Sequence, residues 1–431
     1  MSSDNTPKPF EWLSGGLFFG KGKGGIESVD SCKDVLQLLN GINENLTAIV
    51  LEPEKESSKE ESASSSLDKT AAEDSNKGGD DGANPAPSKF LEARLNRVRV
   101  LLYDERRSTS QQEHRWSSPT VAGATMQALT GDGLKHLMPK LIEFLPRLSF
   151  ESRKHVATVF NYLLVCGFEG SDRDLYKPIM ASFSDYVEKN FDLILTNIVK
   201  GYDCSIHGVT DVGLHCGAMY RSCLKHVNLY RELVSTTERV ERYILPLLDK
   251  YVHVPNFDIS SCAMESLRLV FTAGSDGSFV SDESAQRQMA ELAASFLTRD
   301  YEMIWDERFN PKLMSDQSNY MTKRVALQIL STVLLTRSNY AIMIKYVNSR
   351  KNLILVMHLL RDTSPHITLD AFHVFKVFVA NPNKIPEVTK ILKDNSPKLC
   401  AYLETLHYDK EASDTQFRDE KALIIATLRS M

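Results

Sequence analysis

Apolar residues recur at helical spacing through most of this chain. From Thr120 onward they form segments of about a dozen residues each, with few interruptions between one segment and the next. The same spacing is found again from Phe90 and in segment 26–51, where one broad apolar face is expected to comprise Val35, Leu36, Leu38, Leu39 and Ile42. The alternating apolar and polar runs that are typical of strands, bounded by Gly-Asn or Asp-Gly turns, are missing. The pattern therefore predicts an all-α fold.

The segment with the clearest boundaries is the helix expected to begin at Pro365. Ser364 is a plausible N-cap, and proline suits the first helical position, where its missing N–H costs no hydrogen bond. Asn381 precedes a proline and is therefore expected to end the helix. Most positions between 371 and 379 are apolar, which predicts a helix buried on most sides. The polar residues of this stretch form one narrow stripe, which is expected to face a groove: Asp370, His373 and Lys376.

Several helical segments resemble one another and predict a repeat. Two segments of related shape end at Asn339 and Asn383, which are 44 positions apart, and two others end at Asn228 and Ser275, which are 47 apart. Periods near these values are typical of HEAT and armadillo arrays, in which units of two or three helices stack. The 64 positions between Ser275 and Asn339 predict an insertion or a longer helix pair. We expect an armadillo/HEAT-like α-solenoid with a concave binding face.

Composition divides the chain into four parts. Residues 1–25 are rich in glycine and proline and are expected to form an irregular arm, and 26–51 form a first helical segment. Residues 52–89 contain ten acidic and five basic residues and almost no large apolar side chain, which predicts a disordered, acidic, Ser-rich insert. Residues 90–431 are expected to form the armadillo-like repeat domain, continuous with 26–51.

Charge and cysteine content narrow the class of protein. The formal net charge is -5 and no basic excess appears, so nucleic acid is not the expected partner. Seven dispersed cysteines fit free thiols in a reducing compartment. No apolar run has the length needed to cross a bilayer, and the first residues lack the pattern of a secretory signal. We therefore expect a cytoplasmic protein without membrane insertion.

Two groups of residues resemble a nucleotide-binding loop and a zinc site, but neither supports that function. Gly15, Gly20 and Lys21 approach a phosphate-binding loop, but Gly22 stands where a Ser or Thr must ligate Mg²⁺, and no apolar strand precedes the loop. Six potential zinc ligands lie close together in the sequence. Helical spacing makes several of them core residues instead, because buried cysteine is common. The six residues are Cys204, His207, His215, Cys216, Cys223 and His226. We expect no cofactor and no metal.

Catalytic motifs are also missing: there is no G-x-S-x-G, no H-E-x-x-H and no C-x-x-C. A binding surface is the remaining interpretation. Arg324 and Gln328 follow helical spacing opposite an apolar face, so they are candidates for the concave face of a solenoid. Arg337 and Tyr340 follow at the end of the same helix, and their residue types are enriched at interface hot spots. The sequence indicates a protein-binding protein and not an enzyme.

Eight motifs, in one order along the chain, carry a resemblance to a known family. They are FFGK at 18–21, IVKGYD at 198–203, HCGAMYRSCLKH at 215–226, FDIS at 257–260, NYMTKR at 319–324, MHLLRD at 357–362, FHVFKVFVANPNK at 372–384 and QFRDEK at 416–421. Together they resemble the calcium-binding protein 39 family, also called mouse protein 25. No calcium loop of the D-x-[DN]-x-[DN]-G type is found, so no calcium dependence is expected.

The resemblance implies a scaffold without catalytic activity. Members of that family bind sterile-twenty-type kinases and a related pseudokinase adaptor, and they hold the kinase fold in its active conformation. Fungal relatives work in polarity and cytokinesis through nuclear-Dbf-related kinases. Carried over by motif, the positions that contact the kinase-like domain are Tyr320, Arg324, Arg337 and Tyr340. Met357 matches a pocket for a partner's C-terminal Trp-Glu-Phe motif. In this pocket the family usually has lysine where Gln328 stands. The alternative interpretation is an α-solenoid adaptor in another pathway.

Overall fold

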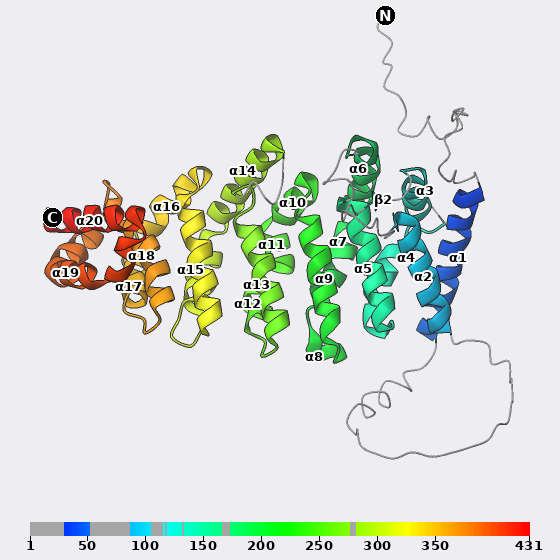
Figure 1. Cartoon of the computed structure of the whole chain (residues 1–431), viewed down its shortest axis with the longest axis horizontal. Coiled ribbons are helices and arrows are strands. Elements are labelled where there is room, and N and C mark those ends of the chain that lie inside the picture. Colours follow the sequence, from blue (N-terminus) through cyan, green and yellow to red (C-terminus); the bar gives the residue numbers. More distant parts are fainter. Residues whose placement is uncertain are drawn as a thin grey trace, which may run out of the picture. The chain divides into compact units, whose positions relative to one another are not determined.

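The computed structural model describes residues 30–51, 87–104, 115–116, 119–131, 133–165, 173–275 and 282–431. These residues form two compact units, 1–189 and 190–431, and helices dominate both of them (Figure 1). The predicted arm at 1–25 and most of the predicted insert, 52–86, lie outside the described residues, as does the near match to a phosphate-binding loop. The predicted all-α repeat architecture is confirmed in the described parts of the chain.

The first unit is built from packed helices, several of which are not neighbours in the sequence. Helix α1 packs against α2 and α3, α2 packs against α5, and α6 packs against α3 and α5. The predicted first helical segment corresponds to α1, and α2 begins three residues before the predicted position 90. The elements are α1 (Asp30–Leu51), α2 (Pro87–Leu102), β1 (Tyr103–Asp104), β2 (Arg115–Trp116), α3 (Pro119–Thr130), α4 (Leu137–Glu143), η2 (Leu145–Arg147), α5 (Phe150–Val165) and α6 (Arg173–Lys189); β1 and β2 pair antiparallel.

The second unit begins at α7 and contains shorter helices joined by tight turns. Its first elements are α7 (Phe191–Lys200), α8 (Cys204–His207), α9 (Thr210–Cys223), α10 (Val227–Val234), α11 (Thr237–Tyr243), α12 (Leu245–Asp249), η3 (Tyr251–His253) and α13 (Phe257–Phe271). They continue with α14 (Glu283–Arg299), the π-helical η4 (Glu302–Leu313), α15 (Tyr320–Leu335), η5 (Arg337–Asn339), α16 (Tyr340–Val347), α17 (Arg350–Leu359), α18 (Pro365–Ala380), α19 (Pro386–Thr405), η6 (Tyr408–Ala412) and α20 (Thr415–Arg429).

Two rows of helices make up most of the second unit. In one row, α9, α13, α15, α18 and α20 pack each against the next (Figure 1). In the other, α10, α14, α16, α17 and α19 do the same. This stacking of one repeat on the next is the arrangement expected of an α-solenoid. The long interval before Asn339 is explained by a longer helix pair, because α14 has 17 residues and the 12-residue η4 follows it.

The core of the second unit joins the two rows through buried aromatic rings. Trp305 lies 4.8 Å from Phe309 and 6.0 Å from Tyr346, between ring centroids, and Tyr346 lies 6.1 Å from Phe378. All four rings are fully buried. The buried indole N–H of Trp305 has no hydrogen-bond partner among the described residues, whereas the Tyr346 hydroxyl donates to Asn310 Oδ1 at 3.0 Å and Asn310 Nδ2 donates to Asn352 Oδ1 at 3.0 Å. Such satisfied buried groups fix the register between neighbouring repeats.

Helix α18 has the predicted limits. It begins at Pro365 after the N-cap residue Ser364 and ends before Asn381. The predicted cap hydrogen bond is not formed: the Ser364 side chain accepts no bond from the helix, and its backbone N–H donates instead to Asp362 Oδ1 at 2.9 Å. The helix is buried on most sides, with Phe372, Phe375 and Phe378 inaccessible to solvent.

Candidate protein-binding surface

Helix α15 carries three of the six sequence-predicted site residues. Its N-cap is Asn319, whose side chain accepts a hydrogen bond from the backbone N–H of Thr322 at 2.9 Å. This bond satisfies a donor at the helix start and fixes where the helix begins. The predicted apolar face is confirmed, since its four members are at most 1% exposed: Ala326, Ile329, Leu330 and Val333.

The opposite face of α15 brings three of the predicted residues together. Tyr320 is 40% exposed at the first helical position, and Arg324 lies one turn later. Nη1 of Arg324 donates to the Tyr320 hydroxyl at 3.3 Å. Gln328 is exposed one further turn along, as i, i+4, i+8 spacing requires. Helical spacing predicted that Arg324 and Gln328 share this face, and Tyr320 was added from the family resemblance. Neither identified the residue that joins the three side chains.

That residue is Asp370, from the second turn of α18. Its Oδ2 lies 3.5 Å from Nε of Arg324 and accepts a hydrogen bond of 3.4 Å from Nε2 of Gln328. The side chain of Asp370 is 16% exposed, and burial raises the pKa of its carboxyl group, with Arg324 acting in the opposite direction. Asp370 was visible in the sequence as part of the polar stripe. Its partners were not, because they lie on another helix.

The rest of the polar stripe faces α20. Nζ of Lys376 donates to Oε2 of Glu420 at 2.7 Å, and both side chains are mostly buried. His373 lies between Asp370 and Lys376 along the helix, and burial, followed by the charge of Lys376, lowers the pKa of its imidazole. The stripe thus ties α18 to α15 on one side and to α20 on the other.

Arg337 and Tyr340 form a second group at the other end of α15. Arg337 opens the short η5 segment and Tyr340 is the first residue of α16. The Arg337 side chain is exposed and the Tyr340 ring is 62% exposed. Neither side chain has a hydrogen bond or an ion pair within the described part of the chain. Arg324 and Arg337 are 13 positions apart, so helical rise places the two groups roughly 20 Å apart.

A hollow lies near this second group, although neither Arg337 nor Tyr340 lines it. Its volume is about 640 Å³, and Ser338, between Arg337 and Asn339, forms part of its wall. Small side chains of α14 form most of the rest, among them Ala294, Ser295 and Thr298. Small residues let another backbone approach closely, so the hollow extends the accessible surface next to the exposed arginine and tyrosine.

Met357, the remaining predicted residue, is half-buried on α17. Helix α17 packs against α18, the same helix that supplies Asp370 to the α15 row. The structure thus connects Met357 to that row through a shared neighbour.

Phe257 is an exposed aromatic residue near the α15 row that was not among the sequence-predicted site residues. Phe257 is 63% exposed at the first position of α13, after the N-cap Asn256, whose side chain accepts from the N–H of Ile259 at 3.0 Å. Tyr320 holds the same position in α15 after Asn319, and α13 packs against α15. The repeated pair of an asparagine and an aromatic residue was the available signal in the sequence.

The cysteine and histidine residues considered as zinc ligands do not converge in the described part of the chain, where no three potential metal ligands cluster. Cys216 and Cys223 are buried in the core of the second unit, as helical spacing predicted, and burial raises the pKa of the Cys223 thiol to about 12. The side chain of His207 lies outside the described residues.

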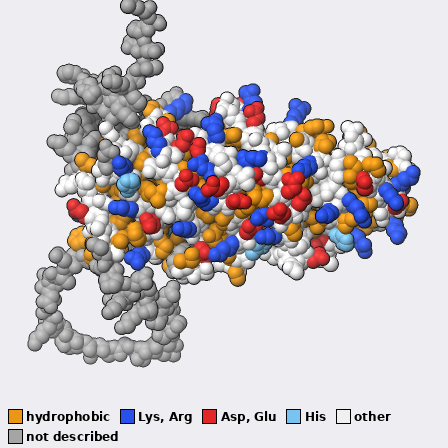
Figure 2. Space-filling model, turned by 180° about the vertical axis from the view of Figure 1, so that it is seen from behind, with side chains coloured by type: hydrophobic (Ala, Val, Ile, Leu, Met, Phe, Trp, Pro, Cys, Tyr) orange, Lys and Arg blue, Asp and Glu red, His pale blue; other side chains and the backbone are white. Residues whose placement is uncertain are grey.

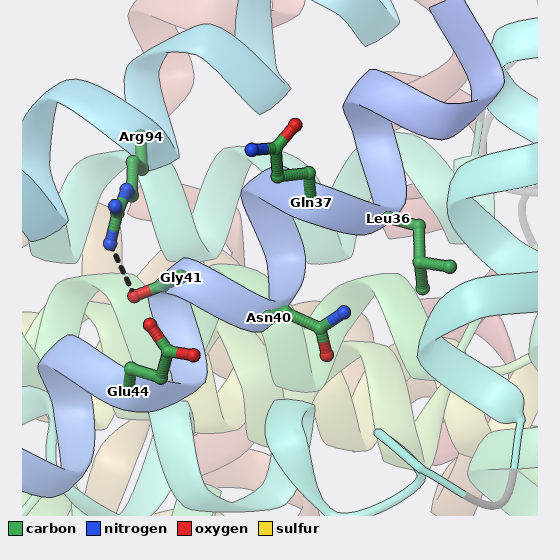
Figure 3. Close-up of a pocket in the computed structure, with 6 residues that line it drawn as sticks. All are labelled: Leu36, Gln37, Asn40, Gly41, Glu44 and Arg94. Carbon is green, nitrogen blue, oxygen red and sulfur yellow. Dashed lines mark hydrogen bonds between the residues drawn. The ribbon is translucent and has the colours of Figure 1, made fainter.

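A second hollow, of about 410 Å³, lies in the first unit between α1 and α2 (Figure 3). Leu36, expected on the apolar face of its helix, is 48% exposed here. The guanidinium of Arg94 is engaged by its own chain, because Nη1 donates to the Gly41 carbonyl at 2.7 Å. A Cβ at position 41 would lie 2.5 Å from Cζ of Arg94, so glycine is needed for this contact. The hollow contains none of the predicted site residues.

Charges are mixed over the visible surface. Figure 2 shows Lys and Arg side chains interleaved with Asp and Glu side chains on the described part of the face that it presents. Among the described helices, none combines the length and the apolar character required to span a bilayer.

Comparison with known proteins places the chain in a family. A profile described as Mo25-like matches residues 52–431. The chain is 33% identical to the human protein named Calcium-binding protein 39-like over 73% of this chain and 80% of that protein. It is 32% identical to the Degreening-related gene dee76 protein of Auxenochlorella protothecoides, over 78% and 88% of the two chains. It is 30% identical to the Mo25-like protein of Schizosaccharomyces pombe, over 68% and 76%.

Among solved structures, a designed armadillo repeat protein aligns with 68% of this chain and 96% of its own, at 12% identity and a TM-score of 0.33. The family resemblance predicted from short motifs is confirmed by the profile and by the named relatives, which cover most of the chain. The chain belongs to the Mo25-like family, a family of scaffold-type proteins.

Proposed function

We propose that this protein is a non-catalytic scaffold that binds sterile-twenty-type kinases, nuclear-Dbf-related kinases or a related pseudokinase-kinase complex and activates them allosterically. The family membership supports a scaffold. Four parts of this proposal are predictions from the sequence: the kinase partner, its activation, the cytoplasmic location, and the division of the chain at residues 25, 51 and 89. Polarity, cytokinesis or growth signalling is the proposed setting.

The observation that carries the proposal is the exposed pair of Arg337 and Tyr340. An arginine and an aromatic ring that stand free near a hollow are the residue types and the setting in which interface hot spots are found. Neither is held by its own fold, so neither has to give up an internal contact when a partner binds. Phe257 and Tyr320 add exposed aromatic surface on the neighbouring helices α13 and α15.

Activation follows from differential binding. A surface that fits only the active arrangement of a kinase domain shifts the population toward that arrangement by the difference between its two affinities. The buried aromatic and asparagine layers between repeats keep such a surface rigid. The surface need not supply any reacting group, in agreement with the missing catalytic motifs.

Gln328 and Met357 supply a second anchor in this proposal. They would hold a terminal segment of the partner, while Tyr320, Arg324, Arg337 and Tyr340 contact its kinase-like domain. Two linked contacts raise the effective concentration of the second one without any new interaction.

Affinity capture with matched variants tests the proposal. The full chain is immobilised and offered purified kinase domains of the sterile-twenty and nuclear-Dbf-related types. We expect capture by the wild-type protein and a loss of at least about tenfold in affinity for Arg337→Ala and for Tyr340→Ala.

The controls remove the same side chains from other exposed places: Arg231→Ala on α10, and Tyr408→Ala in η6, where the ring is 73% exposed. Both controls should bind as the wild type does. Failure to capture any kinase of either type would favour an adaptor in another pathway.

A further inference from the structure

Helix α1 of the first unit leaves one of its faces exposed. It packs against α2 and α3, yet Leu36, Asn40 and Glu44 are exposed at i, i+4, i+8 spacing and so form one stripe along the helix. Gln37, which is also exposed, lies next to this stripe. The four side chains line the hollow of about 410 Å³, and Arg94 reaches it from α2 (Figure 3).

The first helix of a repeat array has a neighbouring repeat on one side only. Its outer face therefore has to be polar or has to be covered by something else. Helix α1 is the first helix that the structure describes, and its Leu36 side chain is 48% exposed beside the hollow. Leu38, one turn before Ile42, is half-buried. The stripe is thus less polar than an uncovered end of an array requires.

The lining of the hollow favours an uncharged and apolar occupant. The charges of Glu44 and Arg94 cancel, and the other lining side chains are amides and a leucine. Nη1 of Arg94 already donates to the Gly41 carbonyl and to Oδ1 of Asn45, so part of the guanidinium is engaged. A hollow without net charge does not attract a charged segment. Its volume admits a few side chains and not a folded domain.

One segment of the chain outside the described residues has this composition. In residues 10–19, FEWLSGGLFF, six of the ten residues are large and apolar and one is charged. The other long segment next to α1 does not match, because residues 52–86 are acidic overall and contain one large apolar residue, Leu67. That second segment also leaves α1 at Leu51, at the opposite end of the helix from Leu36.

Residues 10–19 are also close enough to reach the stripe. Phe19 precedes Asp30, the first residue of α1, by 11 positions, which span up to roughly 36 Å when extended. Leu36 lies six positions into the helix, at about 9 Å of helical rise. Four glycines among residues 20–25 allow the chain to reverse its direction. A segment on so short a tether has a high effective concentration at the hollow, so a shallow contact suffices to hold it.

We propose that residues 10–19 of this chain fold back onto the exposed stripe of α1, cover Leu36 and place large apolar side chains in the hollow between α1 and α2. The segment then closes the first end of the helical array. The inference is independent of the proposed function, since the hollow contains none of the residues assigned to partner binding.

Photo-cross-linking in the full chain tests the inference. The photo-reactive residue p-benzoylphenylalanine replaces Trp12 in one variant and Phe18 in another, so that an aromatic ring is kept at each position. After irradiation at low protein concentration, the cross-linked residues are mapped by mass spectrometry. We expect cross-links within one chain from at least one of the two positions to residues 36–44 or to Arg94. The control carries the same group in place of Leu67 and should give no cross-link to the hollow.

A second pair of variants tests whether the exposed leucine holds the segment. Leu36→Ser, made in the photo-reactive variants, should lower the yield of these cross-links by about fivefold, because the apolar area that the segment covers is then lost. The matched control is Leu423→Ser on α20, where the leucine is 64% exposed and lies in the second unit. This control should leave the yield unchanged.

Four outcomes would overturn the inference. The first is that neither position 12 nor position 18 cross-links to the hollow. The second is a product with the mass of two chains, because a second copy would then occupy the hollow. The third is a cross-link from position 67 to the hollow, which would assign it to residues 52–86. The fourth is a yield that Leu36→Ser leaves unchanged or that Leu423→Ser lowers equally.

Discussion

The ion pair between Arg324 and Asp370 should be measurable as a coupling energy. The perturbation is a double-mutant cycle with Arg324→Met, Asp370→Asn and the two combined, since each substitution removes a charge and keeps most of the volume. At 3.5 Å, two unit charges attract by about 5 kcal/mol in a medium of effective dielectric constant about 20. Desolvation and the 36% exposure of the Arg324 side chain reduce this attraction greatly. Coupling energies of exposed ion pairs are about 0.2–1 kcal/mol.

We therefore expect a coupling of about 1 kcal/mol at low salt, at the upper end of that range because Asp370 is mostly buried. It should fall to about half in 0.5 M salt. Urea unfolding followed by the fluorescence of the buried Trp305 measures it, in a background where Trp12 and Trp116 are replaced by Phe so that the second unit is reported alone. A coupling below about 0.3 kcal/mol, or one unchanged by salt, would refute the assignment of Asp370 as counter-ion.

Two other predictions concern the frame that carries the surface. Lys421→Met should lower the free energy of unfolding of the second unit by about 2–4 kcal/mol. The reason is that the buried Nζ of Lys421 donates to the carbonyls of Leu406 at 2.7 Å and Glu404 at 3.2 Å and pairs with Glu411. A change under about 0.5 kcal/mol in urea unfolding would contradict this prediction. Burial lowers the pKa of His155, so the unfolded chain binds a proton first as the pH falls below about 6.5. Stability that is present above that pH should be lost as the pH falls, and His155→Gln should flatten the curve of urea midpoint against pH. An unchanged slope in that variant would exclude the contribution of His155.

Local patterns predicted the helices and the faces they bury. The limits of α18, the buried face of α15 and the core position of Cys216 all follow from residues within two or three turns of one another. The same patterns placed Leu36 in an apolar face where it is exposed, because periodicity gives a helix face without giving the neighbour that covers it. Ser364 is the N-cap residue of α18 as predicted, although its side chain accepts no hydrogen bond from the helix.

The electrostatics of the surface could not be predicted in this way. Asp370 and Arg324 are 46 positions apart, and only the packing of α18 on α15 brings them together. Spacing placed both residues on polar faces without showing that the two faces meet. Long-range pairing therefore decides whether the α15 row is a basic pocket or a neutral one.

The most direct test of the scaffold function is the activity of a kinase with and without this protein. A purified sterile-twenty-type or nuclear-Dbf-related kinase that the chain captures is assayed for phosphate transfer during titration with the full chain. We expect a saturable rise in the turnover rate of the kinase. Combining Arg337→Ala with Tyr340→Ala should abolish this rise, whereas combining Arg231→Ala with Tyr408→Ala should retain it. Saturating binding with no change in turnover would contradict activation.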